Sequence, residues 1–410
     1  MEKIRFVFVS NYLNHHQIPF CRAMCALMQG SFIFVQTEPV EEERLKMGWS
    51  GENEEPYLKC YYEEPELCRR MILEADTVLF GGTDEESYIR ERLDGGKFVM
   101  RYSERIYKTG QWKAISPKGL IKKYLDHTRY RNAPVYMLCS GAYVPSDFSI
   151  VHAYSGKMYC WGYFPETRRY DMDALMAGKG FSEENDEKKI PYLLWSGRMI
   201  DWKHPQLAVE TAEYLKKNGI RFHLDMIGGG AMEEEIRELI RQKGLEKEVC
   251  MKGFLKPEEV RNYMERADIY LLTSDRQEGW GAVANEAMNS GCALVADHMT
   301  GAAPYLIRHG KNGFVYRDGD RQMLFETVLR LVKDQTLCRK AGREAYHTIK
   351  SKWNAESAAE NLCKLITRLK ERDGMVYDEW TEEEFVPCAP APVISEQSMF
   401  RFLTKKKRGM

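Results

Sequence analysis

The stretch Ser274–Gly291, SDRQEGWGAVANEAMNSG, lies between two short apolar segments, and this arrangement does most to constrain the fold. Ile269–Thr273 precedes the stretch and Cys292–Ala296 follows it, and each has the length and composition of a buried strand. A glycine-rich turn and a helix would connect them, which is the pattern of a β-α-β unit with parallel strands. We therefore expect an α/β protein built on parallel sheets.

Two carboxylates in this stretch, Glu278 and Glu286, have seven residues between them. If the helix starts near Gly281, Glu278 lies in the loop before it, and Glu286 lies about 7 Å along the helix axis. The backbone amides of Gly281, Ala282 and Val283 then lie between the two acids, at the positive end of the helix dipole. Such an arrangement suits a ligand with a central diphosphate and a hydroxyl-bearing sugar at each end.

Cationic side chains follow an earlier predicted strand, at Tyr192–Ser196. This strand ends in Gly197-Arg198 and leads through a short loop to Lys203. Arg198 can donate two parallel hydrogen bonds to phosphate oxygens, and Lys203 can supply a nearby point charge. The alternative is a solvated surface pair. Three further glycines, at 228–230, follow the next strand, but they lack the spacing of a dinucleotide-binding fingerprint.

The segments EGWGAVANE and, upstream of it, GRMIDWKHP resemble family 4 of the retaining glycosyltransferases, most strongly over residues 190–320. The resemblance implies the GT-B fold, in which two Rossmann-like β/α/β domains face each other across a cleft. It implies that Arg198 and Lys203 neutralise the leaving diphosphate and that Glu278 holds the transferred sugar, so that these three are the catalytic candidates. Glu286 would hold the ribose. The donor-binding residues implied are Gly197, Arg198, Lys203, Gly253, Phe254, Glu278, Gly279, Gly281, Ala282, Val283 and Glu286.

Short strands and helices alternate along the chain, which predicts a Rossmann-like acceptor-binding domain over residues 1–165 and a Rossmann-like nucleotide-sugar-binding domain over 190–352. Residues 165–190 are polar and charged, which is typical of a domain boundary. The resemblance implies that a helix over 353–371 packs back on the N-terminal domain. Residues 372–410 are predicted to be a tail of low order.

Candidate acceptor-side residues lie in two loops that follow N-terminal strands. His15 and His16 come after the first strand, where one of them could act as an acid or base or contact a phosphate. A packing role for both histidines is the alternative. Glu104 and Arg105 follow the strand at 97–103, and such charged residues are not expected in a core. In a third loop, residues 81–84 have the sequence Gly-Gly-Thr-Asp, which predicts a helix N-cap.

Composition excludes several classes of protein. The net charge of −1 over 410 residues argues against nucleic acid as a partner, and no apolar run reaches the ~18 residues of a membrane span. The eleven cysteines include no CxxC pair, which indicates reduced thiols in the cytoplasm. Two cations near the diphosphate, without a paired acidic motif, predict activity without a metal or a cofactor. The basic end, FRFLTKKKRGM, either contacts an anionic membrane surface from the cytoplasmic face or is a solvated tail.

The function predicted from these features is that of a metal-independent, retaining glycosyltransferase of the hexosyltransferase type. It would move a sugar from a nucleotide-diphosphate sugar to a saccharide or lipid-linked acceptor in cell-surface polysaccharide or glycolipid synthesis. One alternative is a sugar-nucleotide epimerase of the same fold, which needs acid and base groups on the N-terminal side of the cleft. Another is a non-catalytic nucleotide-sugar-binding partner, which would have lost the phosphate-binding residues.

Overall fold

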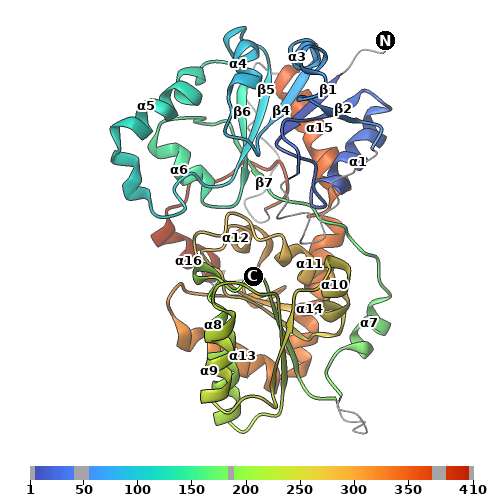
Figure 1. The fold of residues 1–410 in the computed structure, drawn as a ribbon, viewed down its shortest axis with the longest axis vertical. Coiled ribbons are helices and arrows are strands. Elements are labelled where there is room, and N and C mark those ends of the chain that lie inside the picture. Colours follow the sequence, from blue (N-terminus) through green and yellow to red (C-terminus); the bar gives the residue numbers. More distant parts are fainter. Residues whose placement is uncertain (1–4, 41–54, 183–188, 372–384, 406–410) are drawn as a thin grey trace. The chain divides into compact units, whose positions relative to one another are not determined.

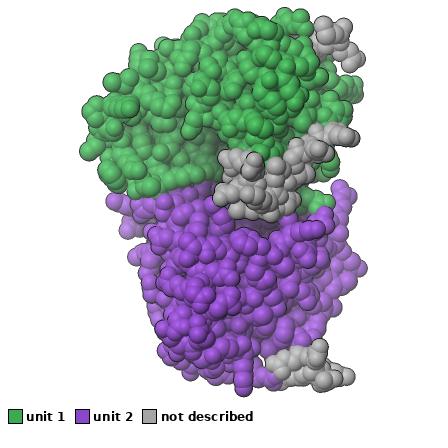
Figure 2. All heavy atoms as spheres, in the orientation of Figure 1, with its two compact units in different colours: residues 1–166, 352–395 green, residues 167–351, 396–410 purple. Residues whose placement is uncertain are grey.

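A computed structural model of the protein describes residues 5–40, 55–182, 189–371 and 385–405. The chain forms two compact units, shown in two colours in Figure 2. Unit 1 comprises residues 1–166 and 352–395, and unit 2 comprises residues 167–351 and 396–410. Each unit is an α/β structure with one parallel sheet and helices packed against it (Figure 1).

The sheet of unit 1 has seven strands in the order β3-β2-β1-β4-β5-β6-β7, and every pairing is parallel. Its inner strands are almost fully buried, because apolar side chains on both faces are covered by helices. The strands are β1 (Phe6–Ser10), β2 (Phe32–Gln36), β3 (Leu58–Cys60), β4 (Thr77–Phe80), β5 (Val99–Ser103), β6 (Val135–Ser140) and β7 (Met158–Trp161).

Helices connect the strands of unit 1, and a helix from much later in the chain, α15, packs on α1 (Figure 1). The helices of this unit are α1 (Ile18–Met28), α3 (Pro65–Glu74), α4 (Ser87–Asp94), η1 (Gln111–Ile115), α5 (Pro117–Asp126), η2 (Thr128–Tyr130), α6 (Val144–Ile150) and α15 (Ala355–Glu371).

The sheet of unit 2 has six parallel strands in the order β10-β9-β8-β11-β12-β13. The first strand of this unit, β8, therefore lies at the centre of the sheet beside β11. The strands are β8 (Tyr192–Ser196), β9 (His223–Ile227), β10 (Val249–Gly253), β11 (Ile269–Leu272), β12 (Ala293–Asp297) and β13 (Phe314–Tyr316).

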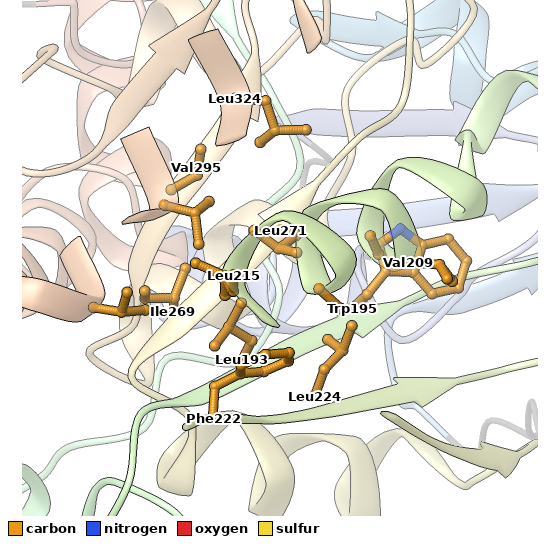
Figure 3. Packing of buried hydrophobic residues seen from close by; sticks show 14 of the residues in the cluster. Leu193, Trp195, Val209, Leu215, Phe222, Leu224, Ile269, Leu271, Val295 and Leu324 are labelled. Carbon is orange, nitrogen blue, oxygen red and sulfur yellow. The ribbon is translucent and has the colours of Figure 1, made fainter. Parts of the chain in front are cut away.

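The core of unit 2 packs helices onto β8 and its neighbours, and Figure 3 shows Trp195 and Leu193 among the residues of this cluster. Trp195 is buried and its indole N–H donates to Thr273 Oγ1 at 2.8 Å, so the one polar atom of that side chain is satisfied. The helices are α7 (Met172–Gly178), η3 (Asp201–Lys203), α8 (Pro205–Lys217), α9 (Glu233–Gln242), α10 (Pro257–Arg266), α11 (Val283–Asn289), α12 (Ala303–Leu306), α13 (Arg321–Lys333), α14 (Gln335–Ser351) and α16 (Glu396–Thr404).

The boundary expected over residues 165–190 is not wholly a linker, because unit 2 begins at Thr167. Arg168 forms an ion pair with Glu265 on α10 at 2.9 Å, and Tyr170 donates a hydrogen bond to the same carboxylate at 2.7 Å. Lys179 is buried and its Nζ donates to the carbonyl oxygen of Ala267 at 2.6 Å. The composition of these polar residues is typical of a linker, but their contacts hold residues 168–179 against the rest of unit 2.

The expected tail of low order over residues 372–410 is wrong for the part that the structure describes. Cys388 donates its N–H to the carbonyl of Cys160 in β7, and Ala391 donates to that of Met158, at 2.8 and 2.9 Å. This stretch therefore extends the hydrogen bonding of unit 1 along β7. The chain then enters α16 in unit 2, where Phe400 lies against Arg317.

Candidate functional site

Most of the predicted site residues lie at the carboxyl ends of β8 and β11, in the centre of the unit 2 sheet. From β8 the chain proceeds outward to β9 and β10, whereas β11, β12 and β13 build the other half of the sheet. The strand order thus reverses between β8 and β11. In open parallel sheets, ligands bind at this switch point, outside the carboxyl ends of the strands.

Lys203 and Glu278 form an ion pair between the loops that follow these two strands. Both side chains are largely buried, with exposed fractions of 14% and 13%. The indole of Trp202 links Lys203 to Arg198, because Lys203 Nζ lies 4.8 Å and Arg198 Cζ 5.8 Å from the ring centroid. The predicted cations and one of the predicted carboxylates are therefore brought together around Trp202.

Glu286 lies in the first turn of α11, near the same end of β8 and β11. Its charge acts on Tyr270 of β11, whose hydroxyl donates to the carbonyl oxygen of Ser196 at 3.0 Å. Burial raises the pKa of Tyr270, and the negative charge of Glu286 raises it further. Glu286, the second predicted carboxylate, is therefore close enough to act electrostatically on the strand end that carries Gly197 and Arg198.

The helix after the β11 loop begins at Val283, two residues later than expected. In the part of the chain that the structure describes, the N–H groups of Gly281, Ala282 and Val283 donate to no backbone carbonyl. Gly281 has φ +88°, and a β-carbon there would lie 3.2 Å from Cγ of Glu278. The loop therefore places three backbone donors beside a carboxylate, in a conformation that favours glycine.

Close backbone contacts explain several glycines around the site. A β-carbon on Gly228 would lie 2.0 Å from the carbonyl oxygen of Gly197, and one on Gly230 would lie 2.6 Å from that of Met199. Both glycines also have positive φ. The 228–230 run thus holds the Gly197–Met199 loop against β9, which is a structural requirement independent of any ligand. Gly279 is approached in the same way, by Gly301.

Gly253 ends β10 with φ +68°, and the next residue, Phe254, is 64% exposed. The Phe254 ring lies against Gly229, where a β-carbon would be 2.7 Å from a ring carbon. A large aromatic side chain is therefore held at the surface, beside the glycine turn that supports Gly197. Such a ring offers a flat apolar face to a planar ligand group.

Sequence reasoning missed a second polar pair beside Lys203. His204 adopts a left-handed conformation, with φ 47°, and its Nε2 lies 3.2 Å from Asp275 Oδ2. The hydrogen bond with Asp275 raises the pKa of His204, against the opposing effect of burial. Asp275 also donates its N–H to the carbonyl of Trp202, at 3.0 Å. This pair thus fixes η3, and with it Lys203, to the β11 loop.

We expect the contribution of this pair to depend on pH. Because the pKa of His204 is raised in the folded state, its stabilisation is fully present below the unfolded value of about 6.5 and is lost as the pH rises through the folded value. The difference in unfolding free energy between wild type and His204→Asn should therefore shrink between about pH 6 and 8, as measured by urea unfolding. His152→Asn is the control, since His152 is exposed and has a similar φ of 52°. Equal pH profiles for the two variants would contradict this role.

The predicted acceptor-side histidines lie in unit 1, in the loop between β1 and α1. The rings of His15 and His16 contact each other, with centroids 3.8 Å apart. His16 also lines a small pocket with an aromatic wall. The pocket residues are Phe8, His16, Gln17, Phe20, Tyr102, Trp161, Gly162, Tyr163 and Phe164.

The loop after β5 differs from expectation at Arg105. This residue is buried, pairs with the fully buried Asp147 at 3.1 Å and lies 5.3 Å from the ring centroid of Tyr143. Arg105 is thus a core residue whose charge is neutralised by a buried partner, a combination that its position at a strand end did not indicate. Glu104 is 26% exposed and accepts hydrogen bonds from Lys108 and from Tyr163, a pocket residue.

The helix N-cap expected at residues 81–84 is also wrong, because α4 begins only at Ser87. The two glycines serve close packing instead. A β-carbon on Gly81 would lie 2.2 Å from the carbonyl oxygen of Tyr102, and one on Gly82 would lie 2.4 Å from Ser10 Oγ. Larger residues would force apart the ends of β1, β4 and β5, where strand order in unit 1 reverses.

Within residues 5–40, 55–182, 189–371 and 385–405, no three His, Cys, Asp or Glu side chains gather in a way that could hold a metal ion. No helix within those same residues combines the length and the apolar character needed to cross a bilayer. All eleven cysteines are free thiols.

Residues 179–348, most of unit 2, match the sequence model of the protein family described as glycosyl transferases group 1. The amylovoran biosynthesis glycosyltransferase AmsK of Erwinia amylovora is 30% identical over 182 residues, which are 43% of this chain and 44% of that protein. The poly(ribitol-phosphate) alpha-N-acetylglucosaminyltransferase of Staphylococcus aureus is 29% identical over 41% of this chain and 34% of its own length. The chain thus spans less than half the length of these curated relatives.

Solved structures resemble the chain over a larger range. Anabaena Alr3699/HepE, crystallised in complex with UDP, matches with a TM-score of 0.64 over 89% of this chain and 100% of its own, at 13% identity. The lipopolysaccharide outer core galactosyltransferase WaaB matches with a TM-score of 0.62 over 89% of this chain and 99% of its own, at 14% identity. These likenesses confirm the predicted fold class, an α/β protein of the GT-B type with two Rossmann-like units.

Proposed function

We propose that the protein is a retaining glycosyltransferase of family 4 that uses a nucleoside diphosphate sugar as donor. The observation that carries the proposal is the cluster at the switch point of unit 2, where Arg198 and Lys203 share the Trp202 ring and Lys203 pairs with Glu278. The match of residues 179–348 to glycosyl transferases group 1 supports it. So do relatives named for amylovoran biosynthesis and for glycosyl transfer to poly(ribitol-phosphate).

In this proposal, the donor diphosphate takes the place of Glu278 as the anionic partner of Lys203. In the structure, Lys203 is neutralised by Glu278. A bound diphosphate brings its own negative charge to Lys203 and Arg198, and it accepts hydrogen bonds from the N–H groups of Gly281, Ala282 and Val283. Glu278 is then released to accept hydrogen bonds from hydroxyls of the transferred sugar. The ion pair thus keeps two charged groups in place until the donor arrives.

The nucleoside end of the donor lies toward Glu286 and Phe254 in this proposal. Glu286 accepts hydrogen bonds from the ribose, while the base lies near Gly253 and the exposed ring of Phe254. Uracil is the first base to test, because Alr3699/HepE was crystallised with UDP and with UDP-glucose. The Gly197–Met199 loop, held by the glycines at 228 and 230, supports this side.

The chemical step depends on stabilising charge. Breaking the bond to the anomeric carbon leaves an electron-poor sugar and a diphosphate that gains negative charge, which Arg198, Lys203 and the nearby amides stabilise without a metal ion. We assign no covalent nucleophile. Retention of configuration is proposed to result from attack of the acceptor hydroxyl on the face of the sugar that the diphosphate leaves, with a diphosphate oxygen taking the proton.

The acceptor is a saccharide or a lipid-linked saccharide of cell-surface polysaccharide or glycolipid synthesis, bound by unit 1. His15, His16 and Glu104 are the proposed contacts. His16 lines the aromatic pocket of that unit, His15 contacts His16, and Glu104 accepts a hydrogen bond from the pocket residue Tyr163. We place the enzyme in the cytoplasm, which the free thiols support, with the basic C-terminal residues 405–408 near the membrane surface.

A donor panel tests this proposal. We expect UDP, alone or as UDP-glucose, UDP-galactose or UDP-N-acetylglucosamine, to raise the melting temperature of the protein more than GDP, ADP or CDP sugars do. Glu286→Gln should reduce the shift, whereas Glu246→Gln, on the exposed surface of unit 2, should not. With a cell-envelope extract as acceptor, the preferred donor should yield free nucleoside diphosphate and a glycosylated product. Conversion of the donor to its epimer without acceptor would instead indicate an epimerase, and no shift with any donor would refute the proposal.

A further inference from the structure

The segment that comprises η1 and α5 in unit 1 exposes more large apolar side chains than any other described stretch of similar length. Of the twelve exposed large hydrophobic residues found among the described residues, six lie between Gln111 and Leu125, which we call the η1–α5 surface. Figure 1 shows α5 at the outer edge of unit 1. The six are Trp112 (68% exposed), Ile115 (79%), Leu120 (41%), Ile121 (62%), Tyr124 (55%) and Leu125 (42%).

The apolar residues of α5 share one side of the helix. At 100° per residue, Leu120, Ile121, Tyr124 and Leu125 fall within an arc of about 140°. In an ordinary globular protein such an arc faces the core, yet here these four side chains are exposed. The buried residue of α5 is Asp126, at the end of the helix. The helix is therefore amphipathic, with its apolar side turned to the solvent.

The charges of the η1–α5 surface have a single sign. Four lysines and no acidic residue lie between positions 111 and 125, although the whole chain has a net charge of −1. Lys122 pairs with Asp126 at 2.9 Å, and Asp84 and Glu86 are further acids near it. Glu86 in turn pairs with Arg101. Lys113 and Lys118 lie farther along the surface and are exposed.

We propose that the η1–α5 surface binds an anionic lipid bilayer. Leucine and isoleucine flanked by tryptophan, tyrosine and lysine are the composition of a helix that lies in the interface of a membrane, with its apolar side among the acyl chains. Lysine suits this position because its alkyl stem contacts the apolar region while its charge reaches the headgroups. A protein partner is less suited, since lysine is depleted in the centres of protein interfaces. This inference does not depend on the proposed transferase activity.

Vesicle sedimentation with the full chain tests the proposal. We expect binding to vesicles of phosphatidylcholine with phosphatidylglycerol, and much weaker binding to phosphatidylcholine alone. Replacing Ile115 and Ile121 together with serine should weaken binding by tenfold or more, because two large apolar side chains no longer contact the acyl region. Lys118→Gln should weaken it by about fivefold at low salt, and less at high salt.

Matched control variants test whether vesicle binding depends on the η1–α5 surface and not on other exposed residues of unit 1. Leu27→Ser with Ile150→Ser changes two exposed apolar residues of unit 1 elsewhere, and Lys364→Gln removes one exposed charge of the same unit. Both controls should bind vesicles like wild type, and far-UV circular dichroism should show that every variant is folded. Equal binding by the test and control variants, or loss of binding only when residues 405–410 are deleted, would overturn the proposal.

The emission of Trp112 provides a local readout, because insertion into a bilayer shifts tryptophan fluorescence to shorter wavelength. The shift should appear with anionic vesicles and should be absent in Trp112→Phe. If Ile115→Ser with Ile121→Ser instead converted a dimer to a monomer in light scattering and left vesicle binding unchanged, the surface would be a contact between copies of this chain, and the lipid proposal would be wrong.

Discussion

Replacing Arg198 and Lys203 together with alanine is expected to lower kcat/KM for sugar transfer by a hundredfold or more. Each of the two cations stabilises the negative charge that develops on the leaving diphosphate, and loss of one such preorganised group typically costs about 10²–10³ in rate. The two side chains lie over the same Trp202 ring, with Arg198 Cζ 5.8 Å and Lys203 Nζ 4.8 Å from its centroid, so their effects should be coupled rather than additive. The measurement is steady-state transfer with the donor identified by the panel.

The same double variant should also lose most of its affinity for the free nucleoside diphosphate, as measured by isothermal titration calorimetry. The matched control is Lys217→Ala with Arg237→Ala, which removes two cations from exposed helices of unit 2. Transfer activity within a factor of a few of wild type in the Arg198 and Lys203 variant would exclude the leaving-group role.

Single and double substitutions distinguish the role of Lys203 from that of Glu278. Lys203→Ala alone leaves the largely buried carboxylate of Glu278 without its cation, so part of its effect should be destabilisation. Adding Glu278→Gln should restore some stability in urea unfolding but should not restore transfer. Recovery of activity in the double variant would mean that Lys203 serves only to neutralise Glu278.

Much of the fold could be predicted from local patterns. Apolar runs such as Tyr192–Ser196 became central strands, since strands buried on both faces of a parallel sheet are continuously apolar. Short or irregular pieces could not be predicted, including β3 at Leu58–Cys60 and the hydrogen-bonded stretch around Cys388. Their order comes from pairing with distant strands, which no window of sequence contains.

In the candidate site, too, some residues could be predicted from local sequence and others depend on distant parts of the chain. Arg198, Lys203 and the two glutamates could be chosen from their chemistry and from their place after strands. Trp202, whose ring contacts both cations, is not among the predicted site residues, although an aromatic residue beside Lys203 favours a cation–π contact. Arg105 was misread, because only the fold reveals the buried carboxylate of Asp147 forty-two residues away. Long-range pairing of this kind decides whether a charged residue belongs to a site or to a core.

Gly301→Ala is expected to disable the site by displacing the β11 loop. A β-carbon on Gly301 would lie 1.8 Å from the carbonyl oxygen of Gly279 and 2.7 Å from its carbonyl carbon. Such a contact involves backbone atoms that no side-chain rotation can relieve, so the loop must move. Gly301 also donates its N–H to the carbonyl of Glu278, at 3.2 Å, and this hydrogen bond would be lost or lengthened.

The expected cost is about 1–3 kcal/mol in unfolding free energy for overpacking, together with a loss of donor affinity of tenfold or more, because Glu278 and the amide of Gly281 lie on the displaced loop. Gly178→Ala is the control, since a β-carbon there meets nothing within 4 Å. Urea unfolding and donor titration should show both effects for Gly301→Ala and neither for Gly178→Ala. A Gly301→Ala protein that loses stability but binds donor normally would show that the 278–281 loop does not form the donor site.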